Sequence, residues 1–366
     1  MKIGIVTFHR AQNYGAVLQM FALQKFLIDN GHQVEFIDYR NKQIEKNYRL
    51  IPVHILFERK NIFKSLELFK NKILTFSIRK SKAASFNKFC KKHLNFSPEI
   101  NVENLESLYN YNILITGSDQ VWNSTITGGI DKFYYLDFSV QKGAKRISYA
   151  ASTEKYNYPF IKSNAKEFSV LMTNFDAISV REHDVAEIIK PLTDKPVHVV
   201  LDPTLLLEEH DYHNIISPPK DENYILVYHL GWKKELIEIA ESMAKEKGLK
   251  IIEIHAGVKP FLETKRHKQD LEPEAFLGYL KNATYIITTS FHGTAFSIIF
   301  KKEFYVFDNG AAMRQYSLLK SLGIENRLIK KKTEINLIET IDFEKLNLKL
   351  ESLKSLSKDF LLSNIK

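Results

Sequence analysis

The start of the chain alternates apolar runs with an amphipathic stretch. An apolar run at residues 3–8 is followed by an amphipathic stretch from Ala16 to Asn30, a stop at Gly31 and a second apolar run at residues 34–38. A strand, a helix with a glycine stop and another strand form a βαβ unit, whose two strands are parallel. The pattern therefore predicts an α/β fold built on parallel sheets.

The same alternation continues along the chain and falls into two series. Because 366 residues exceed what one ordinary core supports, we predict two Rossmann-like domains that face each other across a cleft. Their predicted extents are 1–205 and 206–366, and helical spacing after residue 342 predicts a closing C-terminal helix. The apolar runs of the first series are residues 3–8, 34–38, 112–116, 146–150, 177–180 and 197–201, and those of the second are 224–228, 250–254, 285–288 and 304–307.

A basic segment interrupts the first series. Residues 42–100 carry 14 Lys or Arg and 4 Glu, a net charge of +10, so the rest of the chain carries −1 of the total of +9. Apolar residues such as Phe63, Leu66 and Phe69 recur there at helical spacing, which predicts basic amphipathic helices inserted into the first domain. These helices are a solvated face, a docking surface for an anionic membrane or a lipid-linked glycan, or a contact for another anionic partner. Because the excess charge is confined to this segment, nucleic acid is not an expected partner.

The cellular compartment is predicted from the single cysteine, Cys90, and from the short apolar runs. One cysteine cannot close an intramolecular disulfide, which favours a reducing compartment. The first run is too short for a signal peptide, and no run reaches the length of a membrane span. We expect a cytoplasmic protein, peripheral to the inner face of the membrane if the basic helices dock there.

Candidate site residues stand where the predicted strands end. In open parallel sheets the ligand binds beyond the carboxyl ends of the strands, because loops and helix N-termini converge there. Polar residues and glycines of this chain gather at those positions on both predicted sheets, as a cleft between facing domains requires. They include Asn13 and Gly15, Asp119, and Arg181 in the first series, and Ser290, His292 and Gly293 in the second.

The two candidates from the first loops each have a structural alternative. Asn13 and Gly15 open a helix, where backbone N–H groups can reach an anion, or they form an ordinary turn. Asp119 is either a general base or the acceptor of an Asx turn or helix cap. The loop after the first run lacks the GxGxxG pattern, which disfavours a dinucleotide cofactor.

Arg181 and His292 carry the most direct chemistry. Arg181 is placed to contact a carboxylate or phosphate, and its alternative is a pair with Glu182 or Asp184. His292 precedes Gly293 at a strand-to-helix turn and is either an acid–base group or a structural histidine. No HxxxH or His/Cys cluster accompanies it, so we expect no metal ligation.

Five motifs resemble the polysaccharide pyruvyl transferase family in their order and spacing. The resemblance runs from residue 1 to about 330. It implies a GT-B-like fold, phosphoenolpyruvate as the donor substrate, a glycan hydroxyl pair as the acceptor and no further cofactor. The motifs are Asn13-Tyr14-Gly15 with Leu18-Gln19, Thr116-Gly117-Ser118-Asp119-Gln120-Val121-Trp122, Val180-Arg181-Glu182, Asp202-Pro203-Thr204 and Ser290-Phe291-His292-Gly293.

In the reaction that the resemblance implies, a pyruvyl group moves from phosphoenolpyruvate to sugar hydroxyls of a polysaccharide or its precursor. A ketal forms and phosphate leaves. His292 is then expected to supply a proton and Asp119 to accept one. Arg181 and Arg314 are expected to bind the anionic groups of the donor. Further substrate contacts are expected from Asn13, Gly15, Ser290 and Gly293.

One departure from the family pattern leaves other function classes open. Ketal-forming members tend to carry Arg-Leu-His where this chain has Ser290-Phe291-His292, so one expected donor-binding cation is missing. A GT-B-like pair of domains also suits a glycosyltransferase that uses a nucleotide sugar, since fold does not fix function. A non-catalytic glycan-binding protein is the third class.

Overall fold

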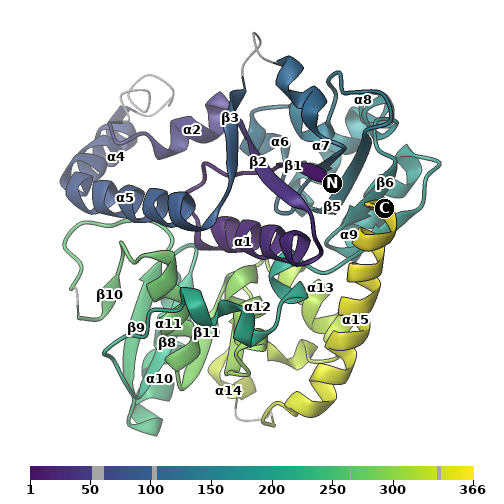
Figure 1. Ribbon diagram of the computed structural model, residues 1–366. Coiled ribbons are helices and arrows are strands. Elements are labelled where there is room, and N and C mark those ends of the chain that lie inside the picture. The colour runs from purple at the N-terminus through teal and green to yellow at the C-terminus, as the bar shows by residue number, and fades with distance from the viewer. Residues whose placement is uncertain (52–61, 101–104, 264, 336–338) are drawn as a thin grey trace.

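The computed structural model describes residues 1–51, 62–100, 105–263, 265–335 and 339–366 (Figure 1). It contains two sheets, and every strand pair among the described residues is parallel. The first sheet has 7 strands in the order β3-β2-β1-β4-β5-β6-β7, and the second has 6 in the order β10-β9-β8-β11-β12-β13. The predicted α/β fold with two Rossmann-like halves is confirmed.

Strands and helices alternate through most of both halves, although β10 follows β9 with no helix among the described residues between them. The strands are β1 (Lys2–Val6), β2 (Gln33–Tyr39), β3 (Phe96–Ile100), β4 (Ile113–Thr116), β5 (Lys145–Ala151), β6 (Ala177–Val180), β7 (Val197–Val199), β8 (Tyr224–His229), β9 (Lys250–His255), β10 (His267–Lys268), β11 (Tyr285–Thr288), β12 (Glu303–Phe307) and β13 (Leu328–Ile329). The helices are α1 (Tyr14–Asp29), α2 (Lys42–Tyr48), α4 (Ile62–Leu74), α5 (Phe76–His93), α6 (Ser124–Thr127), α7 (Tyr158–Ser163), α8 (Ala165–Met172), α9 (His183–Ile189), α10 (Lys234–Lys247), α11 (Pro273–Asn282), α12 (Phe291–Ile299), α13 (Met313–Leu322), α14 (Lys332–Ile335) and α15 (Phe343–Asn364).

The basic insertion is helical over α2, α4 and α5, but its end is not. Residues 96–100 form β3, which pairs with β2 at the edge of the first sheet, so the prediction of a helical insertion up to residue 100 is wrong there. Pro98 lies within β3, and a proline is tolerated in an edge strand because its missing N–H removes no ladder bond on the open side. The edge strands of the second sheet, β10 and β13, have two residues each and give no periodic signal.

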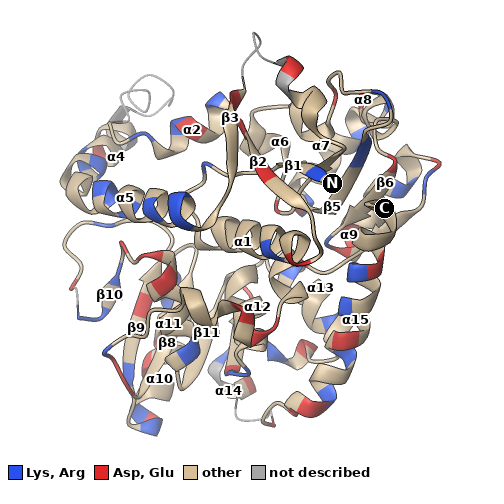
Figure 2. Ribbon diagram, in the orientation of Figure 1, with Lys and Arg blue, Asp and Glu red and all other residues tan. Residues whose placement is uncertain are grey.

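Part of the charge of the insertion anchors it to the second half. Figure 2 shows several Lys and Arg positions along α4 and α5. Lys82 is buried, and its Nζ donates to the backbone oxygen of Ala256 at 2.6 Å. Lys88 pairs with Glu272 at 2.8 Å. The insertion therefore bridges the two halves in addition to presenting basic residues to solvent.

Helix α1 lies between the two sheets (Figure 1). Asn13 caps its first turn, and Gly31 follows its end with a φ of +83° that a glycine adopts readily. The ring of Tyr14 stacks on Phe276 of the second half with centroids 4.2 Å apart. One hydrophobic core runs through α1 and α12 and joins both halves. The first helix is thus part of the interface between the halves.

The C-terminal helix α15 packs along both halves, on one side of the molecule (Figure 1). Its Ser357 hydroxyl accepts a hydrogen bond from the backbone N–H of Leu201 at 2.9 Å. The first sheet ends at Val199 and the second begins at Tyr224, so the predicted boundary at 205 falls between them, and the division into two domains remains a prediction. Among the described helices, none has the length and apolar content needed to cross a membrane.

Candidate functional site

The N-termini of α1 and α12 meet at the edges of the two sheets. His292 is the second residue of α12, and Gly15 is the second residue of α1. A Cβ added to Gly15 would lie 2.0 Å from Nδ1 of His292, whereas ordinary Cβ contacts begin at 3.4 Å. The close approach therefore requires a glycine at position 15, and it places an imidazole of the second half on the first turn of the first helix.

Asn13 and Ser290 cap these two helices. The Asn13 side chain accepts from the N–H of Gly15 at 2.9 Å, and the Ser290 hydroxyl accepts from the N–H of Gly293 at 3.3 Å. Each cap satisfies one of the N–H groups that a helix leaves unpaired at its start. A Cβ on Gly293 would lie 2.4 Å from Oγ1 of Thr288, so this glycine lets α12 start close to β11.

A cavity of about 140 Å³ opens beside the two helix starts. Gly15 and Gly293 lie in the adjoining turns and do not line it, and the lining also excludes Arg181. The remaining five of the eight predicted site residues do line it, and they come from both halves. They are Asn13, Asp119, Ser290, His292 and Arg314.

His292 faces a buried carboxylate. Its Nε2 lies 3.5 Å from Oδ2 of Asp202, which also accepts from the hydroxyl of Ser118 at 3.1 Å. Burial alone would raise the pKa of Asp202, but His292 and Arg181 hold it well below its usual range. The imidazole thus stands next to an ionised carboxylate at ion-pair distance, and its buried Nε2 makes no hydrogen bond among the described residues. Asp202 belongs to a motif noted in the sequence, but no role was predicted for it.

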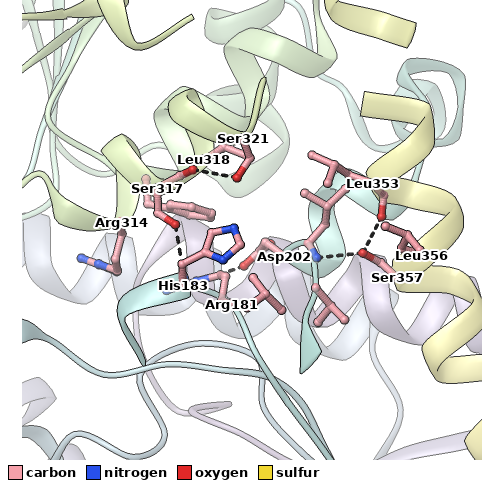
Figure 3. Close-up of a pocket in the computed structure, with 14 residues that line it drawn as sticks. Arg181, His183, Asp202, Arg314, Ser317, Leu318, Ser321, Leu353, Leu356 and Ser357 are labelled. Carbon is pink, nitrogen blue, oxygen red and sulfur yellow. Dashed lines mark hydrogen bonds and ion pairs between the residues drawn. The ribbon is translucent and has the colours of Figure 1, made fainter. Parts of the chain in front are cut away.

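Arg181 is enclosed by protein groups (Figure 3). Its side chain is 1% exposed, with Nε 2.7 Å from Glu182 and Nη1 2.8 Å from Asp202. Nη2 donates to the hydroxyl of Ser152 at 3.2 Å, and the guanidinium lies over the ring of Phe291. The pair with Glu182, left open as an alternative by the sequence, is therefore present. With these partners, Arg181 lies against Asp202 and outside the lining of the cavity, and its role in donor binding stays a prediction.

Arg314 lies at the start of α13 between two cavities. Its Nη2 pairs with Glu154 at 2.8 Å, and both side chains are mostly buried. The Arg314 Nε is buried and has no hydrogen-bond partner among the described residues. Figure 3 shows its guanidinium directed away from the other side chains drawn there. An arginine with a free donor beside the cavity can bind an anionic group.

The second cavity that Arg314 borders has a different character. It measures about 180 Å³ and lies between α13, α15 and the end of the first sheet (Figure 3). Leu318, Leu353 and Leu356 are among its lining residues, and Arg181 and Asp202 lie on one side. Because the acid–base candidates His292 and Asp119 line the first cavity, that cavity is the candidate active site.

Asp119 lies in the loop that follows β4. Its φ is +76°, in the left-handed region that aspartate tolerates better than most residues. Its carboxylate lies 4.0 Å from Nη2 of Arg181, and its side chain is 16% exposed. Tyr48 faces it from α2, and burial together with the charge of Asp119 raises the pKa of Tyr48 to about 12. Asp119 is therefore a carboxylate that a substrate can reach.

Sequence reasoning missed the lining residues that come from the insertion. Ile44, Asn47 and Tyr48 of α2 border the candidate cavity, as do Gln120 and Leu230. Gln120 stands in a motif that the sequence singled out, so a signal existed for it. The α2 residues belong to a segment interpreted as a charged surface, and no periodic pattern connects them with the strand ends.

The sequence matches the family model described as polysaccharide pyruvyl transferase over residues 13–310. This range includes every predicted site residue except Arg314. No curated protein matches the sequence.

The structure is similar to several solved structures at low sequence identity. An alpha-glucosyltransferase in complex with UDP and a 13-mer DNA has 11% identity and a TM-score of 0.50, over 98% of this chain and 91% of that one. The UDP-GlcNAc 2-epimerase from Neisseria meningitidis has 11% identity and a TM-score of 0.46, over 100% and 99%. The glycosyltransferase SnogD from Streptomyces nogalater has 11% and 0.44, over 98% and 95%. At 11% identity the likeness to the alpha-glucosyltransferase concerns the fold, and it agrees with the predicted GT-B-like architecture.

Proposed function

The chain belongs to the polysaccharide pyruvyl transferase family, and on that premise we propose that it transfers a pyruvyl group from phosphoenolpyruvate to a glycan. The observation that carries the proposal is the cavity between the halves, where His292 meets the first turn of α1 beside Asp119 and Arg314. Phosphoenolpyruvate has a carboxylate and a phosphate. Two helix N-termini and one arginine with a free Nε are groups that favour such anions.

The residues of the cavity suggest how the transfer proceeds. His292 gives a proton to the methylene carbon of the donor, which makes the adjacent carbon electrophilic. A sugar hydroxyl attacks that carbon, and Asp119 accepts its proton. The bond to phosphate then breaks, and the neighbouring hydroxyl closes the ketal. The two sugar hydroxyls lose one proton each. One of these protons restores the proton that His292 gave to the methylene carbon, and the other leaves with the phosphate.

In this scheme Asp202 and Arg181 are positioning residues. The ionised Asp202 orients His292 at 3.5 Å, and Arg181 holds Asp202 at 2.8 Å. The absence of an arginine at position 290 leaves Arg314 as the proposed cation for the donor. In this scheme His292 moves a proton and Arg314 binds the donor. Asp202 and Arg181 hold His292 in place.

The test is to incubate the protein with phosphoenolpyruvate and a panel of glycan acceptors, including lipid-linked ones. Phosphate release and the mass increment of a pyruvyl ketal on the acceptor should appear together. A His292→Gln variant serves as the matched control, because it keeps a hydrogen-bonding side chain and removes the acid–base group. Binding of phosphoenolpyruvate without phosphate release in any arm would contradict the transfer.

A nucleotide-sugar glycosyltransferase is the second candidate. The observation that favours it is the fold shared with the alpha-glucosyltransferase that was solved with UDP. Parallel incubations with nucleotide sugars separate the two reactions, since a hexose increment with nucleotide release would replace the pyruvyl increment. Glycan binding with no product in either series would support the non-catalytic class.

We further propose that the insertion docks on an anionic membrane surface at the cytoplasmic face. Phe63 and Leu66 of α4 are 81% and 51% exposed, and the exposed Lys70 lies on the same helix. Exposed apolar residues next to basic ones are typical of helices that lie at a lipid interface. Such a position would bring a lipid-linked acceptor to the enzyme.

Liposome co-sedimentation tests the docking. Binding should require anionic lipid and weaken with salt, because the attraction is screened over about 10 Å at 0.1 M. The pair of changes Lys70→Glu and Lys72→Glu should weaken it. The matched pair Lys245→Glu and Lys247→Glu on the exposed end of α10 should not. Salt-insensitive binding, or equal loss in both pairs, would refute this surface.

A further inference from the structure

A group of three histidines and one glutamate lies at the carboxyl edge of the second sheet, outside the candidate cavity. His229 ends β8, Glu253 and His255 lie at the end of β9, and His267 begins β10. The parallel register pairs His229 with His255 and Glu253 with His267. Because Glu253 and His255 are two residues apart on one strand, they share a face, and their partners share it with them. The register therefore directs all four side chains to one side of the sheet.

The four side chains converge on one carboxylate oxygen. Oε2 of Glu253 lies 3.5 Å from Nε2 of His229, 3.7 Å from Nε2 of His255 and 3.6 Å from Nδ1 of His267. In a tetrahedral site with metal–nitrogen bonds of 2.0–2.1 Å, two ligand atoms are separated by roughly 3.3 Å. These three distances are thus close to those between ligands of a tetrahedral ion, and ligand atoms of His229, Glu253 and His255 all lie within 4.8 Å of one another.

The ring of His229 is buried, with a side chain that is 2% exposed, and neither ring nitrogen has a hydrogen-bond partner within the part of the chain that the structure describes. A buried imidazole without a partner is costly and calls for an explanation. His255 and His267 do contact each other, with Nε2 and Nδ1 2.9 Å apart, a hydrogen bond that ion binding would replace.

The surroundings also suit a ligand set. Arg266 donates its Nε to Oε1 of Glu253 at 2.6 Å, which leaves Oε2 to the histidines. Around bound metals, a ligating carboxylate is commonly oriented by a hydrogen bond from a residue that does not itself contact the metal.

We propose that His229, Glu253 and His255 bind one divalent transition-metal ion of the zinc class, and that the ring of His267 moves closer to become its fourth ligand. Three imidazoles and a carboxylate form a ligand set that zinc accepts, and four protein ligands make a closed, structural site. The ion would tie the ends of β8 and β9 to the start of β10. Leu230, which follows His229, lines the candidate cavity, so the ion would also fix one wall of it. The proposal does not depend on which group the cavity transfers.

Metal binding is measured on the full chain. The purified protein is stripped with a chelator, dialysed and titrated with Zn²⁺ against a chromogenic competitor, and its metal content is counted by mass spectrometry. We expect one tightly bound equivalent, a melting temperature that rises with Zn²⁺ and falls again with chelator, and no rise with Mg²⁺. Co²⁺ in the same site should give the visible absorption of tetrahedral coordination. A folded wild-type chain that binds no equivalent would overturn the proposal.

Two variants locate the ion. His229→Gln and His267→Gln should each weaken Zn²⁺ binding at least tenfold. His210→Gln, a change at an exposed histidine elsewhere, should keep the full equivalent. His267 is the most exposed of the four ligands, so its variant is expected to fold even if the buried one does not. Equal Zn²⁺ affinity in all three variants would place the ion elsewhere and refute this site.

Discussion

The contact between Gly15 and His292 predicts that Gly15→Ala impairs the enzyme while leaving it folded. The new Cβ would lie 2.0 Å from Nδ1 of His292, whereas ordinary contacts begin at 3.4 Å, so the imidazole or the start of α1 must move by about 1.4 Å. A misplacement of about 1 Å can cost roughly 10² in rate, equivalent to about 2.7 kcal/mol on the barrier. We therefore expect turnover to fall about 10²-fold.

Stability should change much less than turnover. Alanine is favoured over glycine in a helix by about 1 kcal/mol, and the crowding of a packed site costs about 1 to 3 kcal/mol. These effects oppose each other, so a small decrease in melting temperature is expected. Gly257→Ala is the matched control, because no heavy atom lies within 4 Å of a Cβ at Gly257.

The assay is phosphate release from phosphoenolpyruvate in the presence of acceptor, with melting temperature measured on the same samples. If Gly15→Ala acts by displacing His292, then adding it to His292→Gln should cause little further loss, since the two changes remove one interaction. Normal turnover in a folded Gly15→Ala protein, or losses that simply multiply in the double variant, would refute this reasoning.

Three further predictions concern charged groups. His292→Gln should lower turnover by about 10² to 10⁴ with donor affinity retained, and a loss that only follows the unfolded fraction would remove His292 from the mechanism. Arg314→Ala should weaken phosphoenolpyruvate binding roughly ten- to hundredfold in calorimetry. Arg181→Ala should instead lower the free energy of unfolding by about 3 to 5 kcal/mol, seen as a lower melting temperature, because it leaves buried carboxylates unpaired. Burial raises the pKa of Asp38, but hydrogen bonds from His9 and Arg10 lower that pKa to about 2. The contribution of Asp38 to folding stability is therefore present above about pH 4 and is lost as pH falls toward 2. In acid denaturation, wild type should therefore lose about 2 kcal/mol more than Asp38→Asn over that range, and parallel curves would contradict the pairing.

The sequence predicted the fold well because its main strands carry a periodic signal. The central strands β4 and β11 are apolar runs that are almost wholly buried, and the helix after β1 ends in a recognisable stop at Gly31. The strands that were missed lie at sheet edges. β3 contains Pro98, and β10 and β13 have two residues each, so neither composition nor alternation distinguishes them from loops.

The candidate site was predicted by position and not by pairing. The rule that ligands bind beyond strand ends placed Asn13 and Asp119 at the edge of the first sheet and His292 at the edge of the second, and the structure brings them to one cavity. The same rule gave Arg181 a donor-binding role, because it does not consider burial. A guanidinium that is 1% exposed needs carboxylates around it, and Glu182 and Asp202 supply them.

Sheet register explains why the histidine and glutamate group was not predicted as a metal site. A search for metal ligands in a sequence looks for short spacings such as HxxxH, which place two ligands on one helix or loop. Here only Glu253 and His255 are close in sequence, while His229 and His267 arrive from neighbouring strands. Sequence alone places each of these residues near a strand end, but a shift of one residue in either pairing would turn a ligand to the opposite face. The site therefore depends on the register between β8, β9 and β10.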